Sequence, residues 1–295
     1  MNMQLLTKIL SYFPQKSAHS LLYMFTHHGK RMHFSNPETY DEWVHYHIIH
    51  TYGKEYAKYA DKYKVRAFVK ECGLSNILIP LLGGPYKKFS DIDFSELPNE
   101  FILKTNHASG PNHYYICNDK KEIDKKRIKE QFDQALEEDF SKFGLEYHYH
   151  YIEPCIVCEE LLHDGNEKMT DYKVVCSYGK PLAILVCTER NKGRDYYSDK
   201  WEYLDYVKEV YRSKQKAKKP ECFDAMIEAA SIISKTFPVA RVDFYVCSEK
   251  LYFGEITLTP SCGCTTYLNE KGQIEIGKMI SNRIYEVRNQ IHSQK

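Results

Sequence analysis

The sequence predicts an α+β fold of two lobes built on antiparallel sheets, and three observations lead to that prediction. The chain has 295 residues, enough for one large domain or two modest ones. Its apolar runs are joined by short segments of the kind that reverse a strand. Strand-like and helix-like segments follow one another in mixed order, whereas a doubly wound parallel fold would alternate them strictly. Neither GxxxxGK[ST] nor GxGxxG occurs, so the common phosphate-binding loops do not apply.

Residues 1–60 are rich in histidine and tyrosine and poor in turn signals, which predicts a mainly helical N-terminal region. Leu5, Leu6, Ile9 and Leu10 would form the apolar face of a short helix. That helix would dock on the core or, as the alternative, on a membrane surface. No run of 18 apolar residues occurs, so the chain is not expected to span a membrane.

Composition limits the kinds of binding partner and the cellular compartment that we expect for this protein. Charged residues make up 27% of the chain and the net charge is only +1, so we expect no nucleic-acid partner. Ten cysteines are spread along the chain without the dense spacing of a small disulfide-stapled domain. They fit a reducing compartment, and the expected localisation is cytoplasmic.

The first half of the main body is expected to hold two helices and two strands. Asp61 is a helix N-cap residue, followed by apolar side chains at helical spacing. After LLGGPYKKF, a loop rich in Gly and Pro, EFILK at 100–104 predicts a buried strand. The run HYYIC at 113–117 predicts the returning strand. Residues 121–141 predict a helix, because their apolar side chains share one face.

The second half continues with strands at about 155–162, 172–177 and 181–187, where apolar runs are bounded by turn residues. An amphipathic helix is expected at 219–237 and a hairpin at roughly 239–257. A final amphipathic helix closes the chain.

The hairpin carries two acids that oppose each other. If it is centred on Glu249, Asp243 faces Glu255 and Arg241 faces Thr257, all four on one face. Opposed carboxylates repel each other and destabilise the hairpin. A bound Mg²⁺ would make the arrangement favourable, because the cation attracts both carboxylates. Arg241 would be a donor for a phosphoryl oxygen. An exposed hairpin face with solvated acids is an equally open interpretation.

A lysine at the end of a strand is the second candidate. Lys104 precedes a loop of small residues that includes His107, Ser109 and Gly110. The lysine could reach a phosphate while loop N–H groups cover the oxygens; the alternative is a solvated strand end. Lys62, in the first turn of the predicted helix, faces an unfavourable helix dipole.

Zinc is not expected. Cys155 and Cys158 form a CxxC, but residues three apart on a strand point to opposite faces. Cys262 and Cys264 flank a glycine and have no second pair.

Taken in order, these elements resemble the ATP-grasp superfamily, and more closely its TupA-like branch associated with teichuronopeptide and capsular polysaccharide synthesis. The resemblance runs from about residue 34 to 267 and is carried by the strings NPETY, ADKYKVR, DIDFSELPNEFILKTNHASG, DYKVVCSYGKP and ARVDFYVCSEKLYFGEIT. It implies an ATP-grasp core at 61–295, with subdomains of about 61–155 and 156–295 that clasp ATP between antiparallel sheets.

The resemblance also implies roles for individual residues. Lys62 and Lys104 would hold the α- and β-phosphates, under a loop formed by residues 107–110. The hinge strand that reads adenine would be Glu159, Glu160 and the backbone through Leu162. Asp171 resembles the acid that bonds the ribose, and Lys173 would also face the phosphates.

For catalysis, the resemblance implies that Asp243, Glu255 and Thr257 bind Mg²⁺ while Arg241 stabilises the transferred phosphoryl group. Two positions depart from the family pattern. Thr257 stands where the superfamily usually has Asn, and Ala108 stands where a glycine is expected in the loop.

The implied reaction joins a carboxylate to an amine through an acyl phosphate. The carboxylate would be a uronic acid of a surface polysaccharide or its precursor. Its candidate contacts are Arg190, Arg194, Tyr197 and Ser261, although the arginine segment could equally be an exposed connection. A phosphotransferase on the same fold, or an ATP-binding module without turnover, are the alternatives.

Overall fold

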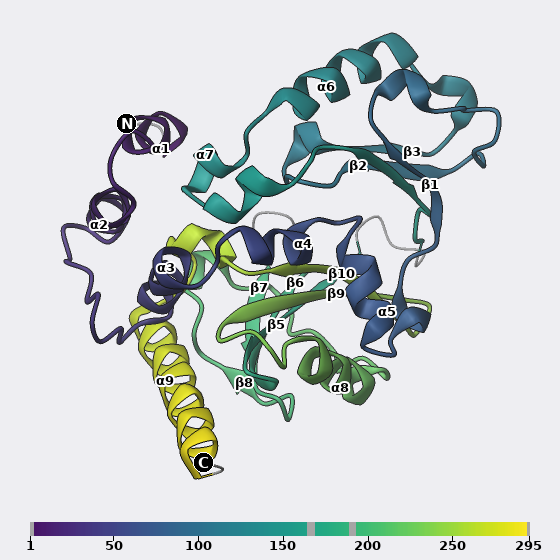
Figure 1. The fold of residues 1–295 in the computed structure, drawn as a ribbon. Coiled ribbons are helices and arrows are strands. Elements are labelled where there is room, and N and C mark those ends of the chain that lie inside the picture. The colour runs from purple at the N-terminus through teal and green to yellow at the C-terminus, as the bar shows by residue number, and fades with distance from the viewer. Residues whose placement is uncertain (1–2, 164–168, 189–192, 294–295) are drawn as a thin grey trace.

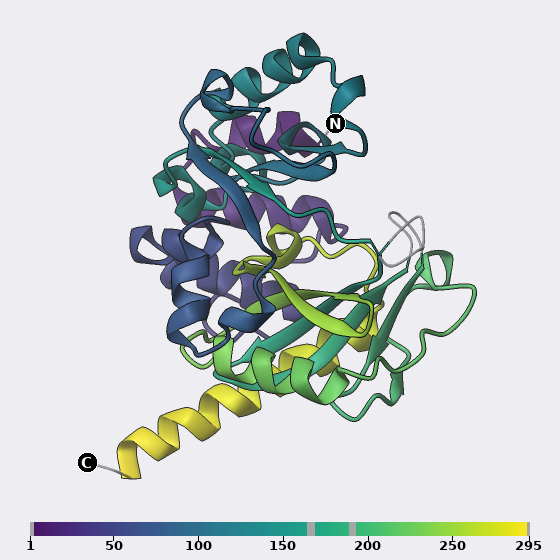
Figure 2. The ribbon, with the colours of Figure 1, turned by 90° about the vertical axis from the view of Figure 1, so that its right-hand side faces the viewer.

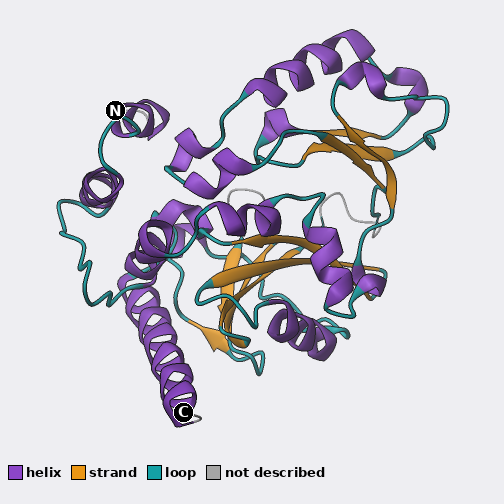
Figure 3. Cartoon of the chain, in the orientation of Figure 1, coloured by secondary structure: helices purple, strands orange, loops and turns teal. Residues whose placement is uncertain are grey.

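The computed structural model describes residues 3–163, 169–188 and 193–293. Two antiparallel sheets form two lobes, one above the other in Figures 1 and 2, with helices on their outer sides (Figure 3). The longer α-helices are α1 (Met3–Leu10), α2 (Gln15–Thr26), α3 (Tyr40–His50), α5 (Val65–Glu71), α6 (Lys125–Glu137), α8 (Phe223–Ile233) and α9 (Glu270–Ser293). The short ones are α4 (Ala57–Ala60) and α7 (Ser141–Gly144).

The smaller sheet has four strands in the order β1-β4-β2-β3. They are β1 (Leu81–Tyr86), β2 (Phe101–Thr105), β3 (Tyr114–Cys117) and β4 (Ile156–Glu159). Helix α6 covers its outer face, where Ile128 and Phe132 pack on Phe101 and Leu103. Strand β4 lies between β1 and β2. It is the last strand of this sheet along the chain, so the chain leaves the sheet after Glu159 and continues toward the six-stranded sheet.

The larger sheet has six strands in the order β10-β9-β5-β6-β7-β8. They are β5 (Asp171–Ser177), β6 (Lys180–Cys187), β7 (Arg194–Tyr197), β8 (Tyr203–Leu204), β9 (Ala240–Cys247) and β10 (Lys250–Thr257). One face packs on α8, where Val242 and Phe244 lie fully buried. On the other face, α3 and α9 cover the end that holds Val175 and Leu185. The rest of that face points toward the four-stranded sheet (Figure 1).

The N-terminal region is helical, as predicted. Helix α3 begins with a capping box in which Thr39 accepts from the Glu42 N–H and the Glu42 carboxylate accepts from the Thr39 N–H. In α1 the expected apolar face is divided: Leu6 and Leu10 are buried, whereas Leu5 and Ile9 are exposed. None of the described helices is long and apolar enough to cross a membrane.

Two sequence predictions fail locally, each for a backbone reason. The helix expected to begin at Asp61 begins at Val65, because the Asp61 carboxylate accepts from the N–H groups of Tyr63 and Lys64 and holds a turn first. The segment read as a Gly- and Pro-rich loop is β1. It is an edge strand with register shifts at Gly83, the setting in which a sheet tolerates proline.

Candidate functional site

The acidic hairpin has the predicted pairing at its far end. Asp243 lies opposite Glu255, and Arg241 lies opposite Thr257. The turn is one residue shorter than predicted, since Cys247 pairs with Lys250. A register shift between Phe253 and Glu255 inserts one extra residue in β10 and so offsets the shorter turn. The predicted pairs therefore form although the predicted turn is wrong.

Three neighbouring strands align a cation and two acids. Lys173 on β5 lies opposite Asp243 on β9, which lies opposite Glu255 on β10. The Lys173 Nζ is 2.7 Å from the Asp243 Oδ2 and 3.6 Å from the Asp171 Oδ2. Arg241, two residues before Asp243, donates from Nε to its Oδ1 at 2.6 Å and from Nη2 to its Oδ2 at 2.7 Å. The Asp243 carboxylate is thus held by two cations.

Lys62 joins this row to the loop of small residues. Its Nζ donates to the Ala108 carbonyl at 2.7 Å and lies 3.5 Å from the Glu255 Oε2. Its backbone N–H donates to the Asn106 carbonyl. In the same loop, Ser109 and Gly110 are exposed.

His107 is buried in that loop, with both ring nitrogens closed off from solvent and its ring beside the backbone of Ala135 and Glu138. Burial, together with the neighbouring His113, lowers the pKa of His107 to about 4. The ring is therefore neutral near pH 7 and carries one N–H.

Lys104 lies on the four-stranded sheet, facing the other lobe. Its Nζ is 2.7 Å from the Glu159 Oε2, and the other carboxylate oxygen of Glu159 accepts from the Arg66 Nη1 at 3.0 Å. Burial alone would lower the pKa of Lys104, but the Glu159 carboxylate raises it above its usual value. Arg66 comes from α5, so one carboxylate ties β4 to a helix of the other lobe.

The electrostatics favour negative charge at the hairpin. Burial disfavours a charged Glu255, yet the cations Lys62 and Lys173 lower its pKa to about 2. Burial raises the pKa of Asp171. The side chains of Lys62, Lys104, Lys173 and Arg241 are only 13–20% exposed. Each of these four cations is paired with a carboxylate of Glu159, Asp171, Asp243 or Glu255, so the space between the two sheets holds buried charges of both signs.

A second row of side chains crosses the same face beside the first. Arg194, Cys187, Asp171 and Tyr245 lie opposite one another in turn on β7, β6, β5 and β9. The Arg194 guanidinium lies 5.1 Å from the ring centre of Tyr267. Of the predicted substrate contacts, Arg194 therefore shares the face of Asp171.

The other predicted contacts lie elsewhere. Tyr197 is buried on the opposite face, stacked on Trp201 at 4.3 Å, with its hydroxyl accepting from the Ala217 N–H. Ser261 is exposed in a turn that directly follows β10, with a φ of 52°. Arg190 lies outside the described residues.

Beyond β4 the chain continues as an extended connection. Glu160 is exposed and its N–H donates to the Pro80 carbonyl at 3.0 Å. Leu162 is half-buried. Glu159 differs from both, because its side chain is buried between two cations.

One acid near the site was missed by the sequence reasoning. Glu146 is buried and accepts from the hydroxyl of Thr259 and from the thiol of Cys262, the latter at 3.1 Å. Burial raises its pKa. It supports the turn around Ser261, where Cys262 also has a positive φ of 54°. No motif marks Glu146, since its role depends on residues more than 110 positions away.

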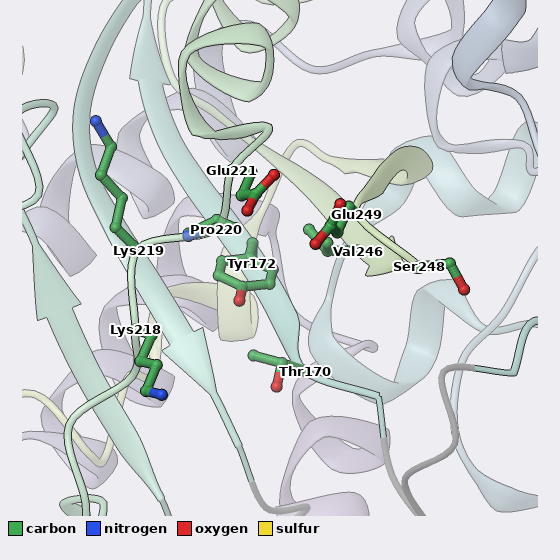
Figure 4. A pocket seen from close by; sticks show the side chains of 9 residues that line it. All are labelled: Thr170, Tyr172, Lys218, Lys219, Pro220, Glu221, Val246, Ser248 and Glu249. Atoms are coloured by element: carbon green, nitrogen blue, oxygen red, sulfur yellow. The ribbon is translucent and has the colours of Figure 1, made fainter.

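Figure 4 shows a pocket of about 320 Å³ on the other face of the larger sheet. It is lined by Tyr172 and Val246, which alternate along their strands with Lys173 and Tyr245. The pocket therefore does not belong to the charged cluster.

The hairpin carries oxygen donors of the type that Mg²⁺ takes, and in this structure both oxygens of Asp243 accept from Arg241 and Lys173. Two carboxylates and the Thr257 hydroxyl lie on one face, and the Glu255 side chain is 32% exposed. Within the described residues no group of three His, Cys, Asp or Glu side chains could hold a metal ion. Mg²⁺ suits such a site, because it keeps several waters and takes phosphate oxygens as its remaining ligands.

The model of the TupA-like ATP-grasp family matches residues 42–281. The chain belongs to this family. Its fold is the ATP-grasp fold, as the resemblance implied. No curated protein matches the chain in sequence.

Solved structures similar to this TupA-like chain include three ligases. D-alanine–D-alanine ligase from Helicobacter pylori has 16% identity and a TM-score of 0.43, over 75% of this chain and 60% of that one. The Bacillus anthracis D-alanine–D-alanine ligase complexed with ATP has 15% identity and a TM-score of 0.46, over 80% and 67%. The L-amino acid ligase from Bacillus licheniformis has 12% identity and a TM-score of 0.39, over 70% and 41%. The chain thus spans about 60% of the length of the Helicobacter ligase.

Proposed function

We propose that this chain is an ATP- and Mg²⁺-dependent carboxylate–amine ligase that forms an amide through an acyl phosphate. The observation that carries the proposal is the row Lys173, Asp243 and Glu255 with Arg241 beside it. Two opposed acids among buried cations have little purpose in a bare core, because charges are costly to bury. They suit a bound metal–triphosphate, which presents both signs of charge.

In this proposal, the cations between the sheets hold ATP. Lys104 and Lys62 take the α- and β-phosphates, and the neutral ring of His107 donates a hydrogen bond from the loop above. Asp171 accepts from the ribose. Glu160 and the backbone through Leu162 contact adenine, while Glu159 keeps Lys104 in place.

The chemistry divides into two steps. The acceptor carboxylate attacks the γ-phosphorus, the bond to the bridging oxygen breaks, and ADP leaves. The amine then attacks the acyl carbon, phosphate leaves, and the amine nitrogen loses a proton. Arg241 donates to the transferred phosphoryl group, and Lys173 keeps the charge of Asp243 balanced. Mg²⁺, held by Asp243, Glu255 and Thr257, supplies positive charge to the phosphate oxygens when bound.

The acceptor is a uronic acid of a surface polysaccharide or its precursor, by similarity to the branch. In this proposal Arg194 binds that carboxylate, and its position on the same face of the sheet as Asp171 supports the assignment. Ser261 lies in the turn after β10 and would give the acceptor a second polar contact. Tyr197 has no part in this proposal, because its side chain lies in the core.

The first experiment is thermal unfolding with and without Mg²⁺ and a non-hydrolysable ATP analogue. A ligand at 100 times its Kd stabilises by about 2.7 kcal/mol, a rise in Tm of several degrees. We expect the Mg²⁺-dependent part of the rise to shrink in Glu255→Gln. The matched control is Glu249→Gln, the same change at the exposed turn of the same hairpin. An unchanged Tm of wild type at millimolar nucleotide would count against the ATP site.

Product analysis then separates the ligase from a phosphotransferase. The protein is incubated with ATP, Mg²⁺, a nucleotide-linked uronic acid and a mixture of amino acids. The ligase releases ADP and inorganic phosphate and yields an amide, whereas a phosphotransferase leaves the phosphoryl group on the acceptor. If the protein binds ATP but forms no ADP with any of the acceptors tested, the result would favour a module that only binds the nucleotide.

A further inference from the structure

The first two helices expose an unusual number of large apolar side chains. Among the described residues fifteen large apolar side chains are exposed, and seven of them fall between residues 5 and 25. We call these seven the N-terminal apolar face: Leu5, Ile9, Tyr12, Phe13, Leu21, Met24 and Phe25. Such a concentration on one short segment marks a surface that something covers.

This face is additional to the one that holds the helices in place. Leu6 and Leu10 of α1, with Ala18 and Leu22 of α2, are buried around Leu145. A helix that needs one apolar stripe to dock is expected to be polar on its other side.

The exposed residues instead repeat at helical spacing. In α1 and the turn after it, they occupy positions 5, 9, 12 and 13; in α2 they occupy positions 21, 24 and 25. Each helix thus has a second apolar stripe, and Figure 1 shows both helices at one outer edge of the molecule.

The segment that carries this face has formal charges of one sign only. Residues 1–37 contain four basic residues, Lys8, Lys16, Lys30 and Arg31, and no Asp or Glu. The remaining chain has 37 Lys and Arg against 40 Asp and Glu. All four cations are exposed, although Lys30 also pairs with Glu270 at 3.2 Å. Apolar and aromatic side chains beside cations, without acids, complement an anionic bilayer surface.

We propose that the N-terminal apolar face inserts into the surface of an anionic lipid bilayer, with Lys8 and Lys16 meeting the headgroups. This proposal does not depend on the ligase activity. The same helices pack on Leu145, the neighbour of Glu146, which supports the turn around Ser261. Membrane docking would therefore bring the turn around Ser261 near the bilayer surface, a consequence that bears on the acceptor only if the proposed function holds.

Vesicle sedimentation tests the proposal with the full chain. Wild type should sediment with vesicles of phosphatidylcholine containing phosphatidylglycerol, and remain in the supernatant with phosphatidylcholine alone. Binding should weaken as salt rises, because salt screens the attraction. Ile9→Ser with Phe25→Ser should lower the bound fraction about tenfold. Lys8→Gln with Lys16→Gln removes two exposed charges, together with the contact of Lys16 on the Phe34 ring, and should lower binding to anionic vesicles.

The matched control is Val210→Ser with Tyr285→Ser, two exposed apolar residues far from these helices at 71% and 67% exposure. It should bind like wild type. Failure of wild type to sediment with anionic vesicles would overturn the proposal, as would equal losses in the control. Light scattering provides the other decisive outcome: a dimer in solution that the Ile9 and Phe25 variant makes monomeric would show that a second copy covers the face.

Discussion

The two faces of the six-stranded sheet differ most at β9, where one face is apolar and the other is charged, although the same strand makes both. On β9, Val242 and Phe244 are fully buried against α8, whereas Arg241 and Asp243 point to the charged cluster. A strand alternates its side chains, so a slip of one residue would bury the charges and expose the core. The apolar face therefore fixes the register on which the charged face depends.

The largest expected effect concerns the apolar face. Phe244→Ala should lower the free energy of unfolding by about 3–5 kcal/mol, because the ring is fully buried and its loss leaves a cavity. Urea unfolding measures this, with Tyr285→Ala, on the exposed part of α9, as the control. A loss below about 1 kcal/mol would mean that α8 does not anchor the strand.

The next effect concerns the charged face. Arg241→Lys should lower kcat by about 10²–10³-fold, because lysine lacks the two-pronged geometry that Arg241 uses on Asp243. A lower Tm is also expected, because the variant loses the paired hydrogen bonds to the buried Asp243 carboxylate. ADP release measures the rate, and Arg288→Lys, on an exposed position of α9, is the control. Equal rates in the two variants would remove Arg241 from the proposed chemistry.

A smaller effect is the pH dependence of stability. The pKa of Glu255 is about 2 in the folded protein, below its unfolded value of about 4.3. Its contribution is present above pH 4.3 and is lost as the pH falls toward 2. Since the side chain is partly exposed, we expect about 1–2 kcal/mol. The difference in unfolding free energy between wild type and Glu255→Gln should shrink as the pH falls from 5 to 3. A constant difference would contradict the lowered pKa.

The smallest effect tests the assignment of Tyr197 to the core. Tyr197→Phe removes one hydrogen bond with the Ala217 N–H and should cost about 0.5–1.5 kcal/mol of stability. The KM for the carboxylate should stay unchanged, whereas Arg194→Gln should raise it. A raised KM in Tyr197→Phe would return this residue to the substrate site.

The hairpin shows how a sequence prediction can succeed with a faulty premise. The sequence places two acids and an arginine at alternating positions, which fixes their common face. It does not reveal the two-residue turn or the shift near Gly254 that offsets it. Both depend on how the strands twist against their neighbours.

Arg194 and Tyr197 are three residues apart in one strand and lie on opposite faces of the sheet. Sequence reasoning grouped them because the strand β7 was not foreseen in that segment. Once the strand exists, the alternation separates them.

The sequence by itself determined the helical N-terminal region, most strands of both sheets and the residues that alternate on the acidic hairpin. These follow from local periodicity and turn chemistry, which act over a few residues. Only the tertiary structure decided that Lys62 reaches Glu255, that Arg66 and Lys104 share Glu159, and that Glu146 supports the turn at Ser261. Those contacts join residues that lie 55 to 193 positions apart, and their geometry is set by how two lobes pack rather than by any local pattern.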